Sequence, residues 1–547
     1  MPQDYDTFIK LAIKNLSYYK DDFQALKKKL CVEKKLFPPT NADLRNHYNE
    51  MLKRGKIKRS EKLEKILKSR AVRTESGVAV IAVLTKPYSC PGKCLYCPTE
   101  KDMPKSYLSN EPAVMRAIKV NFDPYDQAQT RIKSLELNGH NTDKIELIVM
   151  GGTFSSLPKS YQKQFIYECF RACNEYGKRI KNHEFRIMNL DKLFLKEQER
   201  NEKAKHRIIG LTLETRPDYI DEKEIINFRN LGCTRVELGV QSIFNDVLEK
   251  NKRGHGVEET IRATKILKDA GFKINYHIMP GLYGSNLKKD YLMFRELFSN
   301  PDFQPDMLKI YPTVVTKNSA LYKLWKMGKY KPLTDKQFEK FILKIKNNLI
   351  PPYVRIARLV RDVPKTSIVA GPTISNIRQL IKEKSNCQCI RCREVRADYR
   401  IDEKIILDRI DYNASDGTEI FLQYINVPLL SREGGARSKK LFALLRLRIP
   451  SYLCHPAETH NCTSLQNSAI IRELHTYGKL TRINKKDKNS PQHIGLGKKL
   501  VQEAEKIAKK EFKMDKMAVI SGIGVRDYYR KLGYKLKDTY MVKNLKQ

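Results

Sequence analysis

The sequence contains no run of about 18 uncharged apolar residues, the length that a membrane-spanning helix requires. It also lacks the basic and then apolar start of a secretory signal peptide, because Pro2, Gln3 and Asp4 follow the first methionine. We therefore expect a soluble, cytosolic protein without a membrane partner. The composition, 41% hydrophobic over 547 residues, argues against intrinsic disorder and excludes a collagen, a coiled coil and a small disulfide-bonded protein.

Acidic residues are scarce: 62 Asp and Glu stand against 104 Lys and Arg, which leaves a net charge of +42. This excess favours a polyanion, above all a nucleic acid, over a small neutral substrate. A lysine-rich genome is the alternative explanation. The basic residues are concentrated near the N-terminus, where residues 27–73 contain 16 Lys or Arg and 5 Asp or Glu.

The basic N-terminal region has a helical pattern. Apolar residues recur at helical spacing in residues 41–53 and 60–70, which predicts short basic helices with one buried side. We expect these helices to bind nucleic-acid phosphates. The candidate contacts are Lys53, Arg54, Lys56, Lys58 and Arg59.

The twelve cysteines include two close clusters, and close spacing in a cytosolic chain indicates metal binding rather than disulfides. In the first cluster, Cys90, Cys94 and Cys97 follow a strand-like stretch at residues 78–84. Three thiolates spaced in this way can bind three irons of a 4Fe–4S cluster and leave the fourth iron open for a co-substrate. A zinc loop that lacks one ligand is the alternative.

The second cluster lies beyond the barrel-like part of the sequence and contains Cys387, Cys389 and Cys392. Three cysteines suit a structural zinc ion, which needs a fourth ligand from elsewhere in the fold. A second redox cluster and plain loop cysteines remain alternatives. The candidates for the fourth ligand are Cys454, His455, His460 and Cys462.

The first cysteine pattern resembles the radical S-adenosylmethionine (radical SAM) superfamily. Strand-like stretches at residues 145–150, 208–213, 235–242 and 273–279 alternate with helical patterns, which predicts a partial parallel β/α barrel over about residues 78–320. Functional groups are then expected at the carboxyl ends of the strands. The expected cofactor-binding residues are Gly151, Gly152, Thr153, Glu214, Arg216, Glu237 and Gln241.

The C-terminal part of the chain has a different pattern, with strand-like stretches at residues 420–427, 440–448, 469–477 and 517–521. A Q-x-x-G-x-G turn at residues 492–497 opens a helix, and such a turn can bind the pyrophosphate of coenzyme A. The order of these elements resembles the Gcn5-related N-acetyltransferase (GNAT) fold. The expected fold class is therefore α/β: a partial β/α barrel, a GNAT-like mixed domain and a basic helical N-terminal segment.

Five segments together resemble the family of the catalytic subunit of Elongator, over about residue 40 to the C-terminus. They are residues 150–154 (MGGTF), 213–219 (LETRPDY), 389–394 (CIRCRE), 472–475 (RELH) and 528–534 (YYRKLGY). The resemblance implies a tRNA carboxymethyluridine synthase that uses S-adenosylmethionine radicals and acetyl-CoA to install a carboxymethyl group on carbon 5 of the wobble uridine. It implies the anticodon stem-loop as partner, a 4Fe–4S cluster as cofactor, and a chain that acts alone, as a homodimer or with other Elongator subunits.

The same resemblance assigns residues for acetyl-CoA. Lys144, Glu473 and Tyr529 are the implied catalytic residues, with Lys144 reaching the coenzyme from the barrel side. The short spacing of the first cysteine cluster favours a stand-alone, prokaryotic type. Residues 453–466 are an additional segment, expected to be a surface loop. The implied coenzyme contacts are Lys144, Glu473, Leu474, His475, Thr476, Leu496, Gly497, Lys498 and Tyr529.

The expected domains are a tRNA-binding segment at residues 1–75, a radical SAM barrel at 76–370, a zinc-binding linker at 371–400 and a coenzyme-binding domain at 401–547. The rival hypothesis is a protein lysine acetyltransferase with Glu473 as base and Tyr529 as acid. It leaves the cysteine motif and the basic N-terminus without a function. A tRNA-binding scaffold without activity explains still less of the sequence.

Overall fold

We describe the protein from a computed structural model. The structure describes residues 5–15, 23–33, 37–69, 77–177, 189–396, 399, 403–427, 439–451, 465, 467–478 and 495–546. The four candidates for a fourth zinc ligand, nearly all of the additional segment 453–466, and Gln492 of the glycine-rich turn lie outside these residues. None of the described helices is long and apolar enough to cross a membrane.

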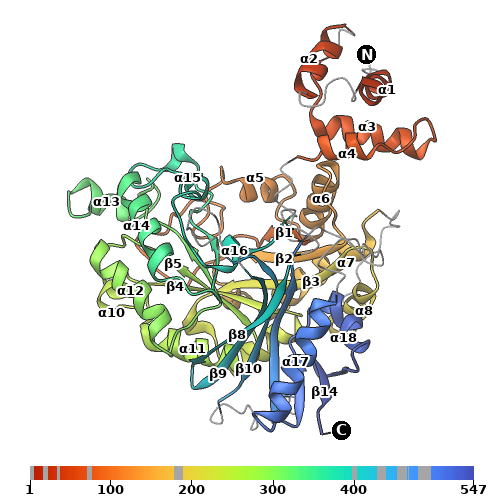
Figure 1. Ribbon diagram of the computed structural model, residues 1–547. Coiled ribbons are helices and arrows are strands. Elements are labelled where there is room, and N and C mark those ends of the chain that lie inside the picture. Colours follow the sequence, from red (N-terminus) through yellow and green to blue (C-terminus); the bar gives the residue numbers. More distant parts are fainter. Residues whose placement is uncertain are drawn as a thin grey trace.

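Four helices near the N-terminus form a small unit with its own apolar core, and this unit projects from the rest of the molecule (Figure 1). A capping box between Thr40 and Asp43 starts the third helix. The fourth helix ends at Ile66, earlier than expected, where Leu67 caps it. The helices are α1 (Tyr5–Asn15), α2 (Phe23–Glu33), α3 (Asn41–Lys53) and α4 (Glu61–Ile66).

Seven parallel strands form the predicted partial barrel, in the spatial order β1 to β7. Helices cover its outer face (Figure 1), as crossover connections between parallel strands require. The two last strands are only four residues long, and this shortness explains why no periodic signal identified them. The strands are β1 (Ala79–Leu84), β2 (Lys144–Met150), β3 (Arg207–Thr215), β4 (Arg235–Gln241), β5 (Lys273–Ile278), β6 (Met307–Ile310) and β7 (Arg355–Arg358).

The helices of the barrel region follow the strands in sequence. The predicted helices at residues 221–231 and 257–270 are confirmed within one residue at each end. The helices are α5 (Pro112–Ile118), α6 (Pro124–Leu137), α7 (Lys159–Glu175), α8 (Leu190–Glu202), α9 (Glu222–Asn230), α10 (Asn245–Lys250), α11 (Val257–Asp269), α12 (Leu287–Ser299), α13 (Leu321–Lys326), α14 (Asp335–Asn348), α15 (Ile377–Leu380) and α16 (Ile390–Arg393).

A second, mixed sheet of seven strands follows, in the order β13-β14-β12-β11-β10-β9-β8. Only β11 and β12 run parallel, and α17 (Leu496–Lys510) connects them. A short helix, α18 (Arg526–Arg530), precedes the last two strands. The strands are β8 (Ile405–Ala414), β9 (Gly417–Asn426), β10 (Leu441–Ile449), β11 (Ser468–Thr476), β12 (Lys516–Val519), β13 (Lys535–Lys537) and β14 (Tyr540–Asn544).

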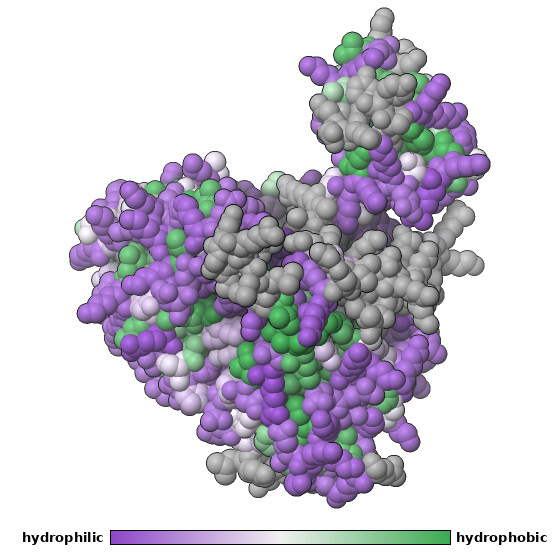
Figure 2. Space-filling model, viewed as in Figure 1, coloured by the Kyte–Doolittle hydropathy of each residue, from purple (hydrophilic) through white to green (hydrophobic). Residues whose placement is uncertain are grey.

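The two sheets share one apolar core, to which side chains of both contribute. The second sheet lies against the amino-terminal end of the barrel strands. Gly522 and Gly524, just beyond β12, approach residues 207–210 so closely that a Cβ atom would clash with the backbone of Ile209 at Gly522 and with Arg207 at Gly524. Figure 2 shows a mostly hydrophilic surface with an apolar patch over the second sheet, where Ile406 and Leu407 of β8 are exposed.

Candidate active site

The predicted cluster ligands lie in the loop that follows β1, at the carboxyl end of the barrel. Cys90, Cys94 and Cys97 line a cavity of about 1330 Å³. The guanidinium of Arg253 donates to Cys94 Sγ at 3.4 Å. A hydrogen bond from Cys97, together with the charge of Arg253, lowers the pKa of Cys94 to about 4. Cys94 is therefore a thiolate, the form that binds metal, and its hydrogen bond with Cys97 raises the pKa of the Cys97 thiol.

The three sulfur atoms do not converge as the ligands of one ion would. Among the described residues, the sulfur atoms of Cys90, Cys94 and Cys97 do not all lie within 4.8 Å of one another, whereas those of the second cysteine cluster do. A single zinc ion needs all its ligands on one centre, but an iron–sulfur cluster binds each cysteine to a separate iron. The three sulfur atoms thus do not form a ready site for one zinc ion, whereas an iron–sulfur cluster does not require them to meet at one centre.

Two buried polar groups near this loop have no hydrogen-bond partner among the described residues, and a bound co-substrate could supply one. Arg216 Nη1 and Gln241 Oε1 are buried and have no hydrogen-bond partner within the described part of the chain. Gln241 also has a φ of 70°, a left-handed conformation that is uncommon for glutamine. At Gly151, with φ 135°, a Cβ atom would lie 2.0 Å from the Thr85 hydroxyl, so only glycine fits there. These residues fit S-adenosylmethionine beside an iron–sulfur cluster.

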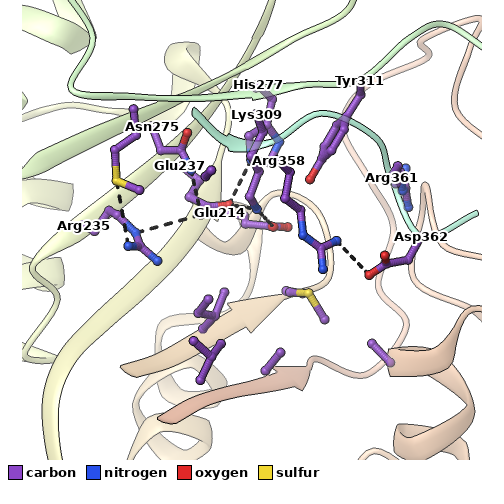
Figure 3. A pocket seen from close by; sticks show the side chains of 18 of the residues that line it. Glu214, Arg235, Glu237, Asn275, His277, Lys309, Tyr311, Arg358, Arg361 and Asp362 are labelled. Atoms are coloured by element: carbon purple, nitrogen blue, oxygen red, sulfur yellow. Dashed lines mark hydrogen bonds and ion pairs between the residues drawn. The ribbon is translucent and has the colours of Figure 1, made fainter. Parts of the chain in front are cut away.

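In the same cavity as the cysteine loop, charged side chains from four barrel strands meet (Figure 3). Glu237 of β4 is at the centre, where it pairs with the ammonium group of Lys309 of β6. His277 Nε2 of β5 lies 2.9 Å from Glu237 Oε2, and Asn275 Nδ2 donates to Glu237 Oε1 at 3.0 Å. Lys309 Nζ is also 3.4 Å from Glu214 Oε1 of β3.

The sheet register explains why these groups meet. Glu214 is paired with Glu237, and His277 with Lys309, so each pair points to the same face of the sheet. Burial opposes the charge of both Glu237 and Lys309. Lys309 and His277 nevertheless hold the pKa of Glu237 well below its usual range, and Glu237 in turn raises the pKa of Lys309. Both groups therefore stay ionised.

The same cavity reaches the second sheet, where Glu473, Leu474, His475 and Tyr529 line it. Glu473 accepts a hydrogen bond from Arg446 at 2.9 Å and lies 3.7 Å from Lys273 of β5. Burial opposes its ionisation, but these two cations lower the pKa of Glu473 to about 2. Such a carboxylate is a weak base.

Burial has the opposite effect on the neighbouring groups. It raises the pKa of Tyr529 above its usual range and lowers that of His475. The phenol therefore stays protonated and the imidazole stays neutral. In this part of the cavity, Tyr529 is a hydrogen-bond donor, whereas Glu473 is a fixed negative charge.

The other expected coenzyme contacts surround an opening between two strands. β12 pairs with β11 only over residues 468–471, so Thr476 lies where β11 extends beyond its parallel neighbour. The first turn of α17 faces this stretch, because a Cβ atom on Gly497 would lie 3.6 Å from Thr476 Cγ2 and 3.8 Å from Leu474 Cδ2. Leu496, Gly497 and Lys498 form this helix start.

Lys144 is not among the residues that line the cavity. It begins β2 at the amino-terminal end of the barrel, where its register neighbour Arg207 packs against Gly524 of the second sheet. Burial lowers the pKa of Lys144. The structure thus places Lys144 at the end of the barrel that faces the second sheet and outside the lining of the cavity that Glu473 and Tyr529 share, and its contact with acetyl-CoA stays a prediction.

The second cysteine cluster has the geometry of a single-ion site. The sulfur atoms of Cys387, Cys389 and Cys392 lie within 4.8 Å of one another. Ile390 N–H donates to Val354 O just before β7, so the loop is attached to the last barrel strand. Three converging sulfur atoms fit a zinc ion with a fourth ligand from outside the described residues.

The five candidate nucleic-acid contacts lie at the end of α3 and in the turn that follows it. Arg59 pairs with Glu64 at 2.9 Å, Lys56 with Asp6 at 3.3 Å, and Arg54 with Glu50 at 3.9 Å. Lys53 and Lys58 are exposed and have no ion pair with any described residue. The structure therefore leaves these two lysines most available to a phosphate backbone.

Sequence reasoning missed three groups in the cavity: Arg253, His277 and Lys309. A signal for Lys309 was present, because a lysine inside the apolar stretch Met307–Ile310 is unusual for a buried strand. Arg253 lies in a loop more than 150 residues from Cys94 in sequence, and no local pattern connects them.

Comparisons with known proteins agree with this geometry. Residues 85–294 match the Radical SAM superfamily, and residues 305–386 match the Radical_SAM C-terminal domain. The chain is 46% identical to a tRNA uridine(34) acetyltransferase of Methanocaldococcus infernus, with 91% of each chain covered. It is 38% identical to the Elongator complex protein 3 of Saccharomyces cerevisiae, over 88% of this chain and 85% of that protein.

A solved structure gives the same result. The archaeal Methanocaldococcus infernus Elp3 with N-terminus deletion (1-46) aligns with a TM-score of 0.70 and 43% sequence identity, covering 86% of this chain and 99% of that one. Relatives well above 30% identity, matched over nearly their whole length, establish the family. The chain belongs to the radical SAM family of Elongator complex protein 3 and the tRNA uridine(34) acetyltransferases.

Proposed function

We propose that this protein is a tRNA carboxymethyluridine synthase, which builds a carboxymethyl group on carbon 5 of the wobble uridine from acetyl-CoA by radical SAM chemistry. One observation carries the proposal. Cys94 of the cluster loop and Tyr529 of α18, in the part of the chain that forms the second sheet, line one continuous cavity. A protein that used only one of its two halves would not need this connection.

At the carboxyl end of the barrel, Cys90, Cys94 and Cys97 would hold the 4Fe–4S cluster, and Arg216 and Gln241 would contact S-adenosylmethionine. When bound, these cofactors supply the one-electron chemistry that removes a hydrogen atom from an unreactive carbon. The buried side chains of Tyr96 and Tyr107 form part of the cavity wall around the cluster loop, and they would help to keep water away from this chemistry.

At the other end, the start of α17 would hold the pyrophosphate of acetyl-CoA, because backbone N–H groups at a helix N-terminus attract anions. The uncovered edge of β11 next to Leu474 would bind the chain that leads to the thioester. Tyr529 would donate a hydrogen bond to the thioester or to the leaving sulfur, because it stays protonated. Glu473 would hold the side chains of Arg446 and Lys273 in place through its ion pairs with them, rather than remove a proton.

Transfer RNA would dock on the N-terminal helices and on the basic edge of the cavity. Arg355, Arg358 and Arg361 lie on or just after β7 and line the cavity. Arginine side chains at a cavity edge suit the phosphates on either side of a base that has left its stack. Cys387, Cys389 and Cys392 would bind a zinc ion that attaches this edge to the second sheet.

The deciding experiment uses reconstituted protein without oxygen, tRNA, reductant, S-adenosylmethionine and acetyl-CoA with a deuterated methyl group. We expect deuterium in 5′-deoxyadenosine and carboxymethyluridine in the tRNA, and neither with a Cys94→Ala variant. Unlabelled 5′-deoxyadenosine and unmodified tRNA, together with acetylation of added protein lysines, would instead support the rival acetyltransferase. Glu473 argues against that rival, because a group with a pKa of about 2 is a poor base for an amine.

A further inference from the structure

The charged cluster in the barrel has partly covered members and a buried centre, and His277, with a side chain that is 15% exposed, is among the partly covered ones. The side chains of Glu214 and Lys309 are 11% and 12% exposed, whereas that of Glu237 is 1% exposed. All four side chains line the cavity, but Glu237 is the one that is almost fully covered. Glu237 is therefore the buried support of the cluster, and Glu214 and Lys309 are an anionic acceptor and a cationic donor that a ligand in the cavity can reach.

Glu214 and Lys309 each retain unused hydrogen-bonding capacity. Lys309 has three N–H donors, of which one is directed to Glu237 and one to Glu214 Oε1 at 3.4 Å. Glu214 Oε2 accepts from the Tyr107 hydroxyl at 2.9 Å, and its remaining lone pairs are available. A donor and an acceptor thus lie side by side on the cavity wall.

A second observation shows that this wall awaits a polar partner. Asn275 is fully buried and lines the cavity, and its Nδ2 group donates to Glu237. Its Oδ1 atom has no hydrogen-bond partner among the residues that the structure describes. A buried acceptor without a partner costs free energy unless a ligand or a water satisfies it.

A metal ion is not the partner that fits. The carboxylates of Glu214 and Glu237 and the ring of His277 come within 4.8 Å of one another, as metal ligands would. However, the ammonium of Lys309 already contacts both carboxylates. A second cation between them would be repelled, so the cluster requires a neutral ligand with its own donor and acceptor.

We propose that Lys309 and Glu214 recognise the uracil base by hydrogen bonds to its imide edge. Lys309 donates to O4, and Glu214 accepts from N3–H. This inference rests on the proposed function, which brings a uridine into the cavity, and adds how the base is selected. Cytosine presents the reverse pattern, because its amino group would face the ammonium and its N3 acceptor would face the carboxylate. A site that buries such a mismatch rejects the wrong base strongly.

Glu237 acts as a positioning residue for this pair. It holds the ammonium of Lys309, and His277 and Asn275 hold Glu237 in turn. The pKa of Lys309 is raised by Glu237, so the donor keeps its charge and the pattern does not reverse with pH. Tyr107 fixes Glu214 from the other side, and its ring lies 4.8 Å from the guanidinium of Arg361.

The test measures binding of the reconstituted full-length protein to anticodon stem-loops that differ only in base 34. We expect the unmodified protein to prefer uridine over cytidine by about tenfold or more. Glu214→Gln is nearly the same shape, and its amide can either donate or accept. This variant should lose most of the preference, mainly through tighter binding of the cytidine loop.

Asp362→Asn is the matched control. Asp362 lines the same cavity, pairs with Arg358 at 2.7 Å, and loses the same single negative charge. It should change the affinity for both loops by the same factor. Lys309→Met, which removes the donor, should weaken the uridine loop more than the cytidine loop, and its circular dichroism spectrum checks that the chain is folded.

Each other outcome has a defined meaning. Equal affinity of the unmodified protein for the two loops, or a Glu214→Gln variant that keeps the full preference, would show that Lys309 and Glu214 do not recognise the uracil base. So would a variant that keeps the preference and loses only affinity for acetyl-CoA, because the pair would then serve the acetyl group. If the unmodified protein makes carboxymethyluridine but does not prefer uridine, the proposed function is supported and the recognition of uracil by Lys309 and Glu214 is wrong. If the protein prefers uridine but makes no carboxymethyluridine, the recognition of uracil is supported and the proposed function is wrong.

Discussion

Arg472 of β11 and Asp306, the residue before β6, form a fully buried bidentate ion pair, with Nη1–Oδ1 3.0 Å and Nη2–Oδ2 2.6 Å. The pair connects the second sheet to the amino-terminal end of the barrel. A shift in strand register makes it possible: Arg446 pairs with Glu473 but Leu447 with Ile471, so Arg472 is the additional residue of a β-bulge. The bulge lets Arg472 contact the barrel beside Glu473.

Asp306→Asn should strongly destabilise the protein. Lys268, Arg446 and Arg472 all lie within ion-pair distance of Asp306, so the variant leaves buried cations without their counter-charge. The free energy of unfolding should fall by about 3–5 kcal/mol, measured by urea denaturation. Asp416→Asn, whose side chain is 61% exposed and pairs with Lys265, is the control and should barely change the urea midpoint. Equal effects of the two variants would contradict the prediction.

The contribution of Glu473 to stability should depend on pH. Its pKa is about 2 in the folded protein and 4.5 in an unperturbed carboxyl, so the unfolded chain binds more protons there. The stabilisation is complete above about pH 4.5 and is lost as the pH falls toward 2. The difference in urea midpoint between the unmodified protein and Glu473→Gln should therefore shrink on acidification. A difference that is constant over this range would exclude the ion pairs with Arg446 and Lys273 as its cause.

Cys94→Ala should lose the iron of the reconstituted protein together with its visible absorbance. Cys173→Ala is the matched control, because Cys173 is buried in α7 and lies outside the cysteine loop. Iron per chain, measured by elemental analysis, should stay unchanged in the control. Full iron loading of the Cys94 variant would show that this thiol is not a cluster ligand.

Cys389→Ser should remove zinc without removing iron. The three sulfur atoms of its cluster converge, and this triplet is attached to β7 rather than to the β1 loop. Elemental analysis of purified protein should therefore show that the two metals are lost independently. Zinc content equal to that of the unmodified chain would mean that the triplet is a plain cysteine loop.

Reversing the charge of Lys53 and Lys58 together should weaken tRNA binding and flatten its salt dependence. Each lost phosphate contact lowers the slope of log affinity against log salt by about 0.9 for duplex nucleic acid. Lys510 and Lys513, exposed at the far end of α17 from this unit (Figure 1), supply a control with the same charge change. If both double variants show the same salt slope as the unmodified protein, α3 and its turn are not the docking surface.

Much of the barrel was predictable because its signals are local. β1 to β3 are largely apolar stretches that glycine or a charged residue follows within two positions, and the cysteine spacing belongs to one loop. Helices α9 and α11 showed their apolar spacing directly. β6 and β7 could not be recognised in this way, since four residues are too few to show a period.

The chemistry of individual residues was less predictable. The sequence marked Glu473 as a catalytic candidate, but its base strength depends on Arg446 and Lys273, which come from another strand of its own sheet and from the barrel. Likewise Lys309 meets Glu214 only because β3 to β6 align their inward-facing residues. A charge environment is a sum over neighbours in space, and no spacing in the chain encodes it.

The sequence by itself determined the fold class, the two cysteine clusters and the family, because each of these depends on residue type and short-range spacing. Only the tertiary structure decided that one cavity joins the cluster loop to the second sheet, that Arg472 and Asp306 connect the two sheets, and that Glu214 and Lys309 share one wall. Those relationships bring together residues about 90 to 440 positions apart in sequence, and packing of the whole core, rather than any local propensity, creates them.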